Sequence, residues 1–239
     1  MPLTRERAEQ IFKLVLKYST ADETEAMLGS TAFSLTRFAN NTIHQNVLEE
    51  SSYLSVRAVS GQRTARASSN RFDEPSIRQL AEAALDLART QPPDPDLLPM
   101  RGPQTYRVVN RSYGETAELA PMARAETVKK VIARAEKDQL TAAGIFSSGA
   151  SAFGLFNSRG LASFHEETVS EFSVTMLGPT SSGWAKRTSP YAMELDPEAL
   201  ADRAARKALE SVNPQEIEPG RATVILEPAA VLDLLGFVA

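Results

Sequence analysis

Residues 32–69 read AFSLTRFANNTIHQNVLEESSYLSVRAVSGQRTARASS. Apolar and polar side chains alternate in this stretch, most clearly at residues 33–37 and 54–58, and a period of two is typical of strands with one buried face. The turn signals ANNT and SGQ separate the runs, because Asn and Gly tolerate the positive φ angles of tight hairpins. The segment from Glu23 to Ser68 therefore predicts a meander of four or five antiparallel strands.

An amphipathic helix is predicted on each side of this meander. In the opening segment, Ala8, Ile11 and Val15 recur at helical spacing. After the meander, Asp73 is placed to cap a second helix. The apolar stripe of that helix comprises Ile77, Leu80, Ala81, Ala84, Leu85 and Ala88. Each larger side chain of such a stripe contributes about 1.5–3 kcal/mol when buried, so the stripe is expected to dock on the sheet.

A proline-rich stretch follows the second helix. Residues 92–103, PPDPDLLPMRGP, hold five of the 14 prolines of the chain. Proline cannot continue a helix or a central strand, so this stretch is interpreted as the boundary between two units.

The second unit is predicted to repeat the order helix, strands, helix. A helix is expected near residues 123–138, followed by glycine-punctuated segments that indicate a second antiparallel sheet. Asp196-Pro197, a capping residue followed by proline, opens a last helix. Its stripe comprises Ala201, Ala204, Ala205, Ala208, Leu209 and Val212. Most of these side chains are small, so this helix is expected to approach a sheet closely.

The last segment predicts a strand at residues 222–226 and an apolar helix after Pro228. We interpret it as the start of a truncated third domain, because the sequence stops within an apolar run. The predicted fold class is α+β, with two antiparallel-sheet/helix units and the start of a third, mainly β domain. The predicted boundaries are 1–95 for the first domain, 96–119 for the connector, 120–214 for the second domain and 217–239 for the third.

Composition excludes several classes of protein. The net charge is −4 with Lys and Arg scattered, which is unlike the basic footprint of nucleic-acid binders. There is no cysteine, so this stretch holds neither a disulfide framework nor a thiolate metal site. The charged N-terminal segment does not fit a signal peptide, and no run reaches the roughly 18 apolar residues of a membrane span. We therefore expect a cytoplasmic protein without nucleic-acid or membrane partners.

The sequence holds no complete catalytic or metal-binding set. His165 is followed by Glu166-Glu167, but the H-E-x-x-H zinc motif needs a second histidine where Val169 stands. The other histidine, His44, is interpreted as an exposed strand residue. The sequence contains no G-x-S-x-G nucleophile elbow and no phosphate-binding loop. Adjacent carboxylates such as Glu49-Glu50 point to opposite faces of a strand, so they do not form a shared acid/base site.

Three segments together are similar to one known family. The run from Ser34 to Asp73, with the helix IRQLAEAALDLAR after it, resembles the first domain of TldD/PmbA proteins. The segment NSRGLASFHEETVSEFSVTMLGPTSSGWAKRTSP resembles their second domain, and ATVILEPAAVLDLLGFVA resembles the opening of their third. The resemblance implies a cytoplasmic metallopeptidase system that hydrolyses unfolded or unstructured peptides. Extended peptides would then add to exposed strand edges of the chain.

The resemblance also implies a division of labour between two chains. TldD-type chains carry H-E-x-x-x-H in the third domain and bind zinc, whereas PmbA (TldE) chains lack these ligands and pair with them. In TldD-type chains a Leu-Leu pair precedes His-Glu, but here Leu234-Leu235 precedes Gly236-Phe237. We therefore expect no catalytic and no metal residues in this chain, and zinc in a TldD-type partner. A homodimer, and a non-catalytic regulatory protein of the DNA gyrase modulator type, remain the alternatives; no substrate-binding residues are assigned.

Overall fold

A computed structural model describes residues 3–238 of the chain. It contains one six-stranded antiparallel sheet with the strand order β3-β2-β1-β4-β5-β6. The strands are β1 (Glu23–Ala39), β2 (Thr42–Ser60), β3 (Arg63–Ser69), β4 (Thr141–Asn157), β5 (Ala162–Leu177) and β6 (Ser182–Ser189). The helices are α1 (Arg5–Tyr18), α2 (Glu74–Thr90), α3 (Gly114–Ala117), α4 (Pro121–Lys137), α5 (Pro197–Glu210) and α6 (Pro228–Leu235), with a short 3-10 turn, η1 (Ala192–Glu194).

The predicted α+β class is confirmed, but the strand count and the number of sheets differ from the prediction. The first segment forms three strands, because β1 and β2 are long and the two turn signals end them. Asn40 and Asn41 both have positive φ in the first turn, as does Gly61 in the second. The second predicted sheet is not separate, since β1 pairs with β4 from Glu25↔Asn157 to Phe38↔Gly144. Alternation identifies strands but carries no information on which distant strand lies beside them.

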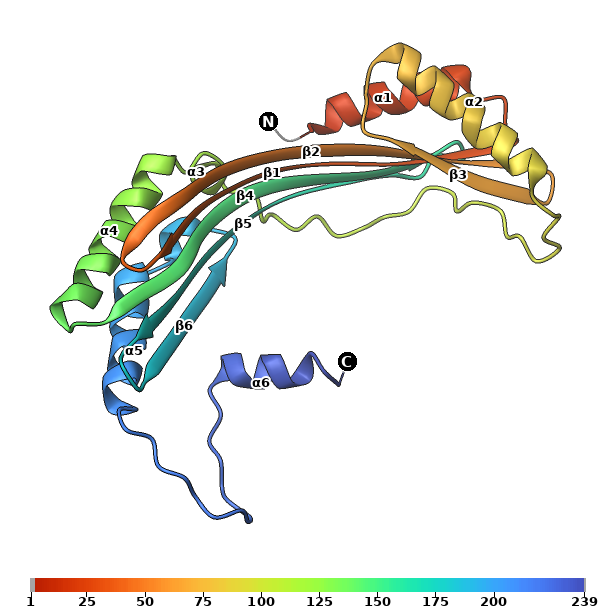
Figure 1. Cartoon of the computed structure of the whole chain (residues 1–239). Helices are drawn as coiled ribbons and strands as arrows, with labels where there is room; N and C mark the ends of the chain where they lie inside the picture. Colours follow the sequence, from red (N-terminus) through yellow and green to blue (C-terminus); the bar gives the residue numbers. More distant parts are fainter. Residues whose placement is uncertain (1–2, 239) are drawn as a thin grey trace.

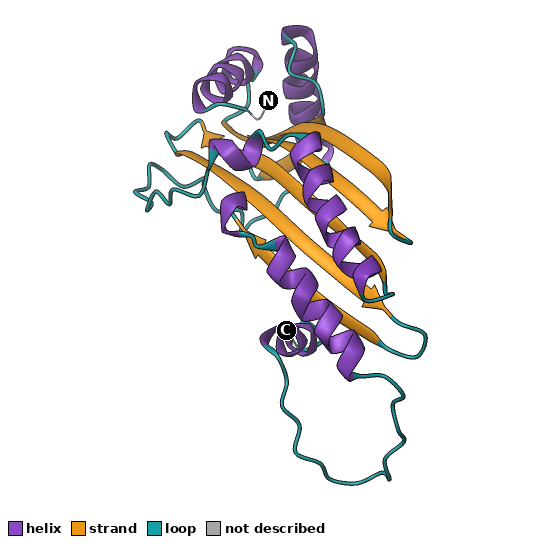
Figure 2. Cartoon of the chain, turned by 90° about the vertical axis from the view of Figure 1, so that its left-hand side faces the viewer, coloured by secondary structure: helices purple, strands orange, loops and turns teal. Residues whose placement is uncertain are grey.

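The helices α1, α2, α4 and α5 cover the two ends of one face of this sheet. Figure 1 shows α1 and α2 over one end of the arched sheet and α4 and α5 over the other. Figure 2 shows the same helices lined up on that face. We call this side the helix face and the opposite, concave side the open face. The apolar core is accordingly divided into two clusters, one under each helix pair.

Local signals placed the helices well. Asp73 accepts a hydrogen bond from the Ser76 N–H, and Asp196 accepts one from the Ala199 N–H, so both predicted caps are confirmed. All six stripe residues of α2 are buried. In α5 the four alanines are buried together with Leu200, whereas Leu209 is about half exposed. Val212 is also about half exposed and lies beyond the end of α5 at Glu210.

The approach of α5 to the sheet is very close, as its small side chains predicted. A Cβ atom placed on Gly183 of β6 would lie 2.0 Å from the carbonyl oxygen of Ala204. The helix backbone therefore rests directly on the strand backbone, and glycine is required at this contact.

The proline-rich connector runs along the open face and not away from the protein (Figure 1). Met100 is buried, and its N–H donates to a carboxylate oxygen of Glu23. Further along, the Arg111 carbonyl accepts from the Thr168 N–H at the edge of β5. The connector is thus held by hydrogen bonds at several points, although most of its side chains are exposed. The predicted domain boundaries stay predictions.

The C-terminal segment departs from the sequence analysis. Residues 222–226 form no strand, because they pair with no strand in the described part of the chain. The helix after Pro228 is present as α6, yet it buries none of its residues. It lies on the open-face side of the sheet, and a Lys207–Glu227 ion pair joins the segment before it to α5.

Candidate functional site

The expected ligand position lies at the exposed end of α6. Gly236 is the C-cap of the helix, and Phe237 is 90% exposed. Neither side chain offers a donor atom to a metal ion, so these residues do not fit the zinc site of the TldD type. Among residues 3–238, no group of three or more His, Cys, Asp or Glu side chains is placed to hold a metal ion.

The two histidines lie far apart on the sheet. His44 is exposed, at the irregularity where Arg37 pairs with Gln45 but Phe38 pairs with Ile43. His165 lies on the open face of β5, where its Nε2 atom is 3.7 Å from an oxygen of Glu167. The same carboxylate lies 4.0 Å from Arg111 Nε. Glu167 is therefore part of a local charge network, and no second histidine is near it in the register.

The open face carries three successive cross-strand rows that the sequence analysis did not identify. The first row joins Tyr53, Gly29, Phe153 and His165, and the second joins Ser51, Thr31, Ser151 and Glu167. The third joins Glu49, Phe33, Gly149 and Val169. Alternation placed each residue on a face, but only the pairing of β1 with β4 aligns the rows.

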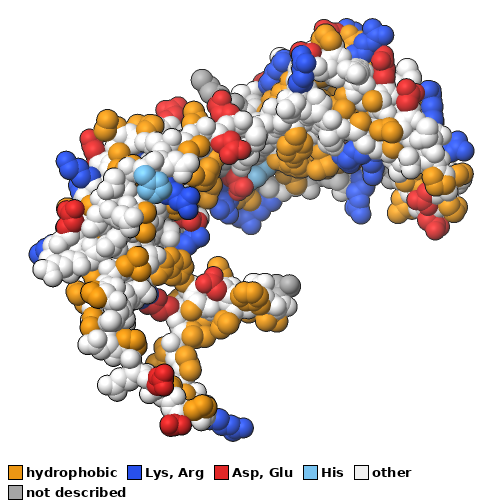
Figure 3. All heavy atoms as spheres, in the orientation of Figure 1, with side chains coloured by type: hydrophobic (Ala, Val, Ile, Leu, Met, Phe, Trp, Pro, Cys, Tyr) orange, Lys and Arg blue, Asp and Glu red, His pale blue; other side chains and the backbone are white. Residues whose placement is uncertain are grey.

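Glycine and hydroxyl residues give this surface its shape. A Cβ atom on Gly29 would lie 2.7 Å from the ring of Tyr53, so the ring covers the glycine. In the next row, the hydroxyls of Thr31 and Ser51 are 2.7 Å apart. A band of short hydroxyl side chains thus separates two rows that contain aromatic rings. In Figure 3 the molecule is hollowed on this side.

Charges on the open face are mostly paired. Glu25 lies 2.8 Å from Arg66 and 3.6 Å from Arg57, and Glu171 lies 2.8 Å from Lys186. Such pairs cancel one another locally, so the face presents no continuous basic surface for a polyanion.

A polar island lies between the two core clusters on the helix face. Its centre is the guanidinium of Arg124, which is 1% exposed and donates to Thr36 Oγ1, the Leu119 carbonyl and Ser148 Oγ. Burial lowers the pKa of Arg124 below its ordinary value. All three acceptors are neutral, so the side chain fastens α4 and the turn before it to β1 and β4.

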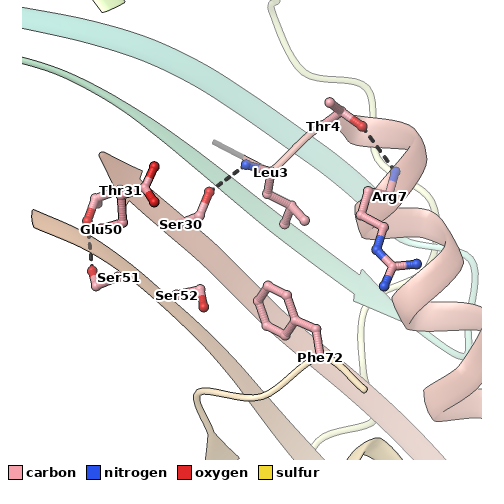
Figure 4. A pocket seen from close by; sticks show the side chains of 9 residues that line it. All are labelled: Leu3, Thr4, Arg7, Ser30, Thr31, Glu50, Ser51, Ser52 and Phe72. Carbon is pink, nitrogen blue, oxygen red and sulfur yellow. Dashed lines mark hydrogen bonds between the residues drawn. The ribbon is translucent and has the colours of Figure 1, made fainter. Parts of the chain in front are cut away.

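Two hollows border the outer edge of β2. One, of about 370 Å³, lies beside the N-terminal end of α1 (Figure 4). It is lined by Leu3, Thr4, Arg7, Ser30, Thr31, Glu50, Ser51, Ser52 and Phe72. The other, of about 680 Å³, lies between the β1–β2 turn and α4. Neither has the convergent acid, base or nucleophile of an active site.

Comparison with known proteins identifies two family regions in the chain. Residues 25–88 match the model of PmbA/TldA metallopeptidase domain 1, and residues 111–212 match that of the PmbA/TldA metallopeptidase central domain. None of the curated proteins is significantly similar in sequence.

Solved structures share the fold. TldE from Thermococcus kodakarensis superposes with a TM-score of 0.72 at 20% identity, over 84% of this chain and 47% of that one. Candidate modulators of DNA gyrase from Thermotoga maritima and Bacteroides thetaiotaomicron each give a TM-score of 0.71 at 17% identity. The match to each covers 90% of this chain, and 50% and 52% of theirs. The chain therefore spans about half the length of these structures, and the likeness shows the fold alone.

Proposed function

Because the chain belongs to the PmbA/TldD metallopeptidase family, we propose that it is a subunit of a cytoplasmic system that hydrolyses unfolded or unstructured peptides. In this proposal the chain is the metal-free, PmbA/TldE-like subunit. A TldD-type partner supplies the zinc and the catalytic glutamate.

The observation that carries the proposal is the pair of family regions, residues 25–88 and 111–212, in one continuous sheet. The subunit assignment rests on Gly236 and Phe237, which follow Leu234-Leu235 where a TldD-type chain has His-Glu. A glycine cannot bind zinc, and a phenylalanine cannot take a proton from a bound water.

The open face supports a role in holding peptides. Its hydroxyl band offers hydrogen bonds that do not depend on side-chain identity, and the rings of Tyr53, Phe153 and Phe33 offer apolar contact beside it. Such a surface suits extended chains of varied sequence. In the proposed assembly it forms a wall of the space in which the partner cleaves peptides.

A reconstitution assay tests this proposal. The purified chain is incubated with unfolded casein, alone and with a TldD-type chain, with and without a chelator. We expect no hydrolysis by the chain alone and hydrolysis with the partner that the chelator abolishes. Metal analysis should give well under one zinc per chain. Stoichiometric zinc that is lost in His165→Ala would contradict the subunit assignment.

The names of two structural relatives favour one alternative, a regulatory protein that acts on DNA gyrase. This function needs a protein partner and no catalytic residue. A supercoiling assay with purified gyrase separates the two proposals. A change in supercoiling rate at stoichiometric amounts of the chain, without peptide hydrolysis in the reconstituted system, would favour the regulator.

A further inference from the structure

The outer edge of β2, on the side away from β1, is unpaired over more than half of the length of the strand. β3 pairs with β2 only from Leu54↔Ser69 to Ser60↔Arg63. Residues 42–53 have β1 on one side and, in the part of the chain the structure describes, no strand on the other. Every second residue of such an edge directs its N–H and C=O outward, which makes the edge a template for another extended chain.

An apolar groove follows this edge at the end near the hairpin. Ile43 and the exposed flank of α4, with Met122, Ala125 and Ile132, line the hollow of about 680 Å³. The other flank of α4 is occupied by α5, to which Lys130 and Arg134 are ion-paired. The groove is therefore the vacant place beside α4 in the helix layer, next to the free edge.

A polar pocket marks the opposite end of the edge. Ser30 and Ser52 face each other across β1 and β2 on the helix face, and Arg7 lines the other side of the hollow from α1 (Figure 4). Within the described residues, the Arg7 guanidinium donates a hydrogen bond to the amide oxygen of Gln10, which carries no charge. The pocket is thus lined by hydroxyls, the Glu50 carboxylate and the Arg7 cation, and the Ser30 hydroxyl already accepts from the Leu3 N–H. This polar lining suits a hydrogen-bonding side chain.

The spacing of the two hollows matches an added strand. Both lie on the helix face, where Ile43 and Ser52 pair with Phe38 and Ser30, two positions that are eight residues apart on β1. At about 3.3 Å per residue this is roughly 26 Å. We propose that the β2 edge, residues 42–53, binds an extended peptide of eight to ten residues as a seventh strand. An apolar side chain of the peptide enters the α4 groove, and a hydrogen-bonding side chain enters the α1 pocket.

The edge favours an unfolded peptide over a second copy of this chain. Two copies paired along this edge would bring Glu49 of both chains onto one short ladder, where like charges are destabilising. A foreign peptide carries no such penalty, and main-chain hydrogen bonds bind it with little sequence preference. This inference deepens the proposed function and rests on it, because it identifies where the peptides are held.

Backbone methylation of a probe peptide tests the edge without altering the protein. The probe is a decapeptide with leucine first, eight threonines after it and a fluorescein-labelled lysine last. The leucine and the threonine eight residues after it then lie on the same side of the extended strand. Two variants carry N-methyl groups on the odd or on the even residues. We expect one set to weaken binding, measured by fluorescence anisotropy, at least tenfold, and the other set to change it less than threefold. Equal binding of both sets, or no binding of the unmodified probe at millimolar protein, would overturn the proposal.

A matched pair of variants tests the groove. Met122→Glu places a charge in the α4 groove, and Met193→Glu is the control in η1; both methionines are more than half exposed, so both variants should fold. We expect at least fivefold weaker binding of the probe by Met122→Glu. Met193→Glu should bind the probe as tightly as the native chain. Equal effects of the two substitutions on probe binding would overturn the proposal. So would dimers in sedimentation that the probe dissociates, because the edge would then pair two copies of this chain. If only one of the two N-methylated probes binds weakly but the reconstituted system hydrolyses no peptide, the result would count only against the proposed peptidase role.

Discussion

The contact between α5 and β6 gives the sharpest stability prediction. In Gly183→Ala, the new methyl group would lie 2.0 Å from the Ala204 carbonyl oxygen and 2.6 Å from the Ala208 nitrogen. An ordinary contact begins near 3.4 Å, so α5 must move away from β6 by about 1.4 Å. The backbone cannot yield as a flexible side chain would, and the four buried alanines of α5 lose contact together.

Gly183→Ala should lower the free energy of unfolding by about 3 kcal/mol, the upper end of the range for overpacked cores. Urea unfolding followed by fluorescence measures it locally, because the single tryptophan, Trp184, is the next residue on β6. Far-UV circular dichroism reports on the whole chain in parallel. The two signals should separate if the end of the sheet under α4 and α5 unfolds first.

The matched control is Gly220→Ala, since a Cβ atom on Gly220 meets nothing within 4 Å. It should change the free energy of unfolding by less than about 0.5 kcal/mol. If Gly183→Ala is equally neutral, the close packing of α5 on β6 and the argument built on it are wrong.

Three further predictions concern the helix face and the C-terminal segment. Arg124→Met should lower the free energy of unfolding by about 2 kcal/mol in urea titrations, because the part-buried Leu119 carbonyl and the two buried hydroxyls lose their donor; an unchanged midpoint would refute this. Hydrogen bonds from Ser76 lower the pKa of Asp73, so this cap stabilises α2 above the ordinary aspartate pKa and is lost as pH falls through the lowered value. Asp73→Ala should therefore be less stable than the native chain at pH 7, with the gap closing in acid, whereas Asp73→Asn should keep most of the cap at both pH values; a constant gap would contradict the titration. Limited trypsin digestion should cut first at Arg221, because residues 209–228 are all exposed and the connector is hydrogen-bonded to the sheet; first cuts at Arg101 or Arg107 would show that the connector detaches more easily.

Short-range signals in the sequence determined the local structure. A capping aspartate before a stripe with helical spacing placed α2 and α5, because the forces involved act within one or two turns. Asn40-Asn41 and Gly61 placed both hairpin turns for the same reason. The small side chains of α5 also indicated its close contact with a sheet. The missing donor atoms at Gly236 and Phe237 follow from residue identity alone.

Tertiary structure decided which of these elements lie together. The pairing of β1 with β4 joins residues more than a hundred positions apart, and hydrogen bonds between backbones carry no residue-specific signal. That pairing unites the two predicted sheets and aligns Tyr53, Gly29 and Phe153 on the open face. The free edge of β2 likewise depends on where β3 stops pairing, at Leu54↔Ser69. The sequence alone therefore predicts strands and helices, whereas the surfaces offered to peptides arise only when distant strands meet, because their side chains become neighbours through the register.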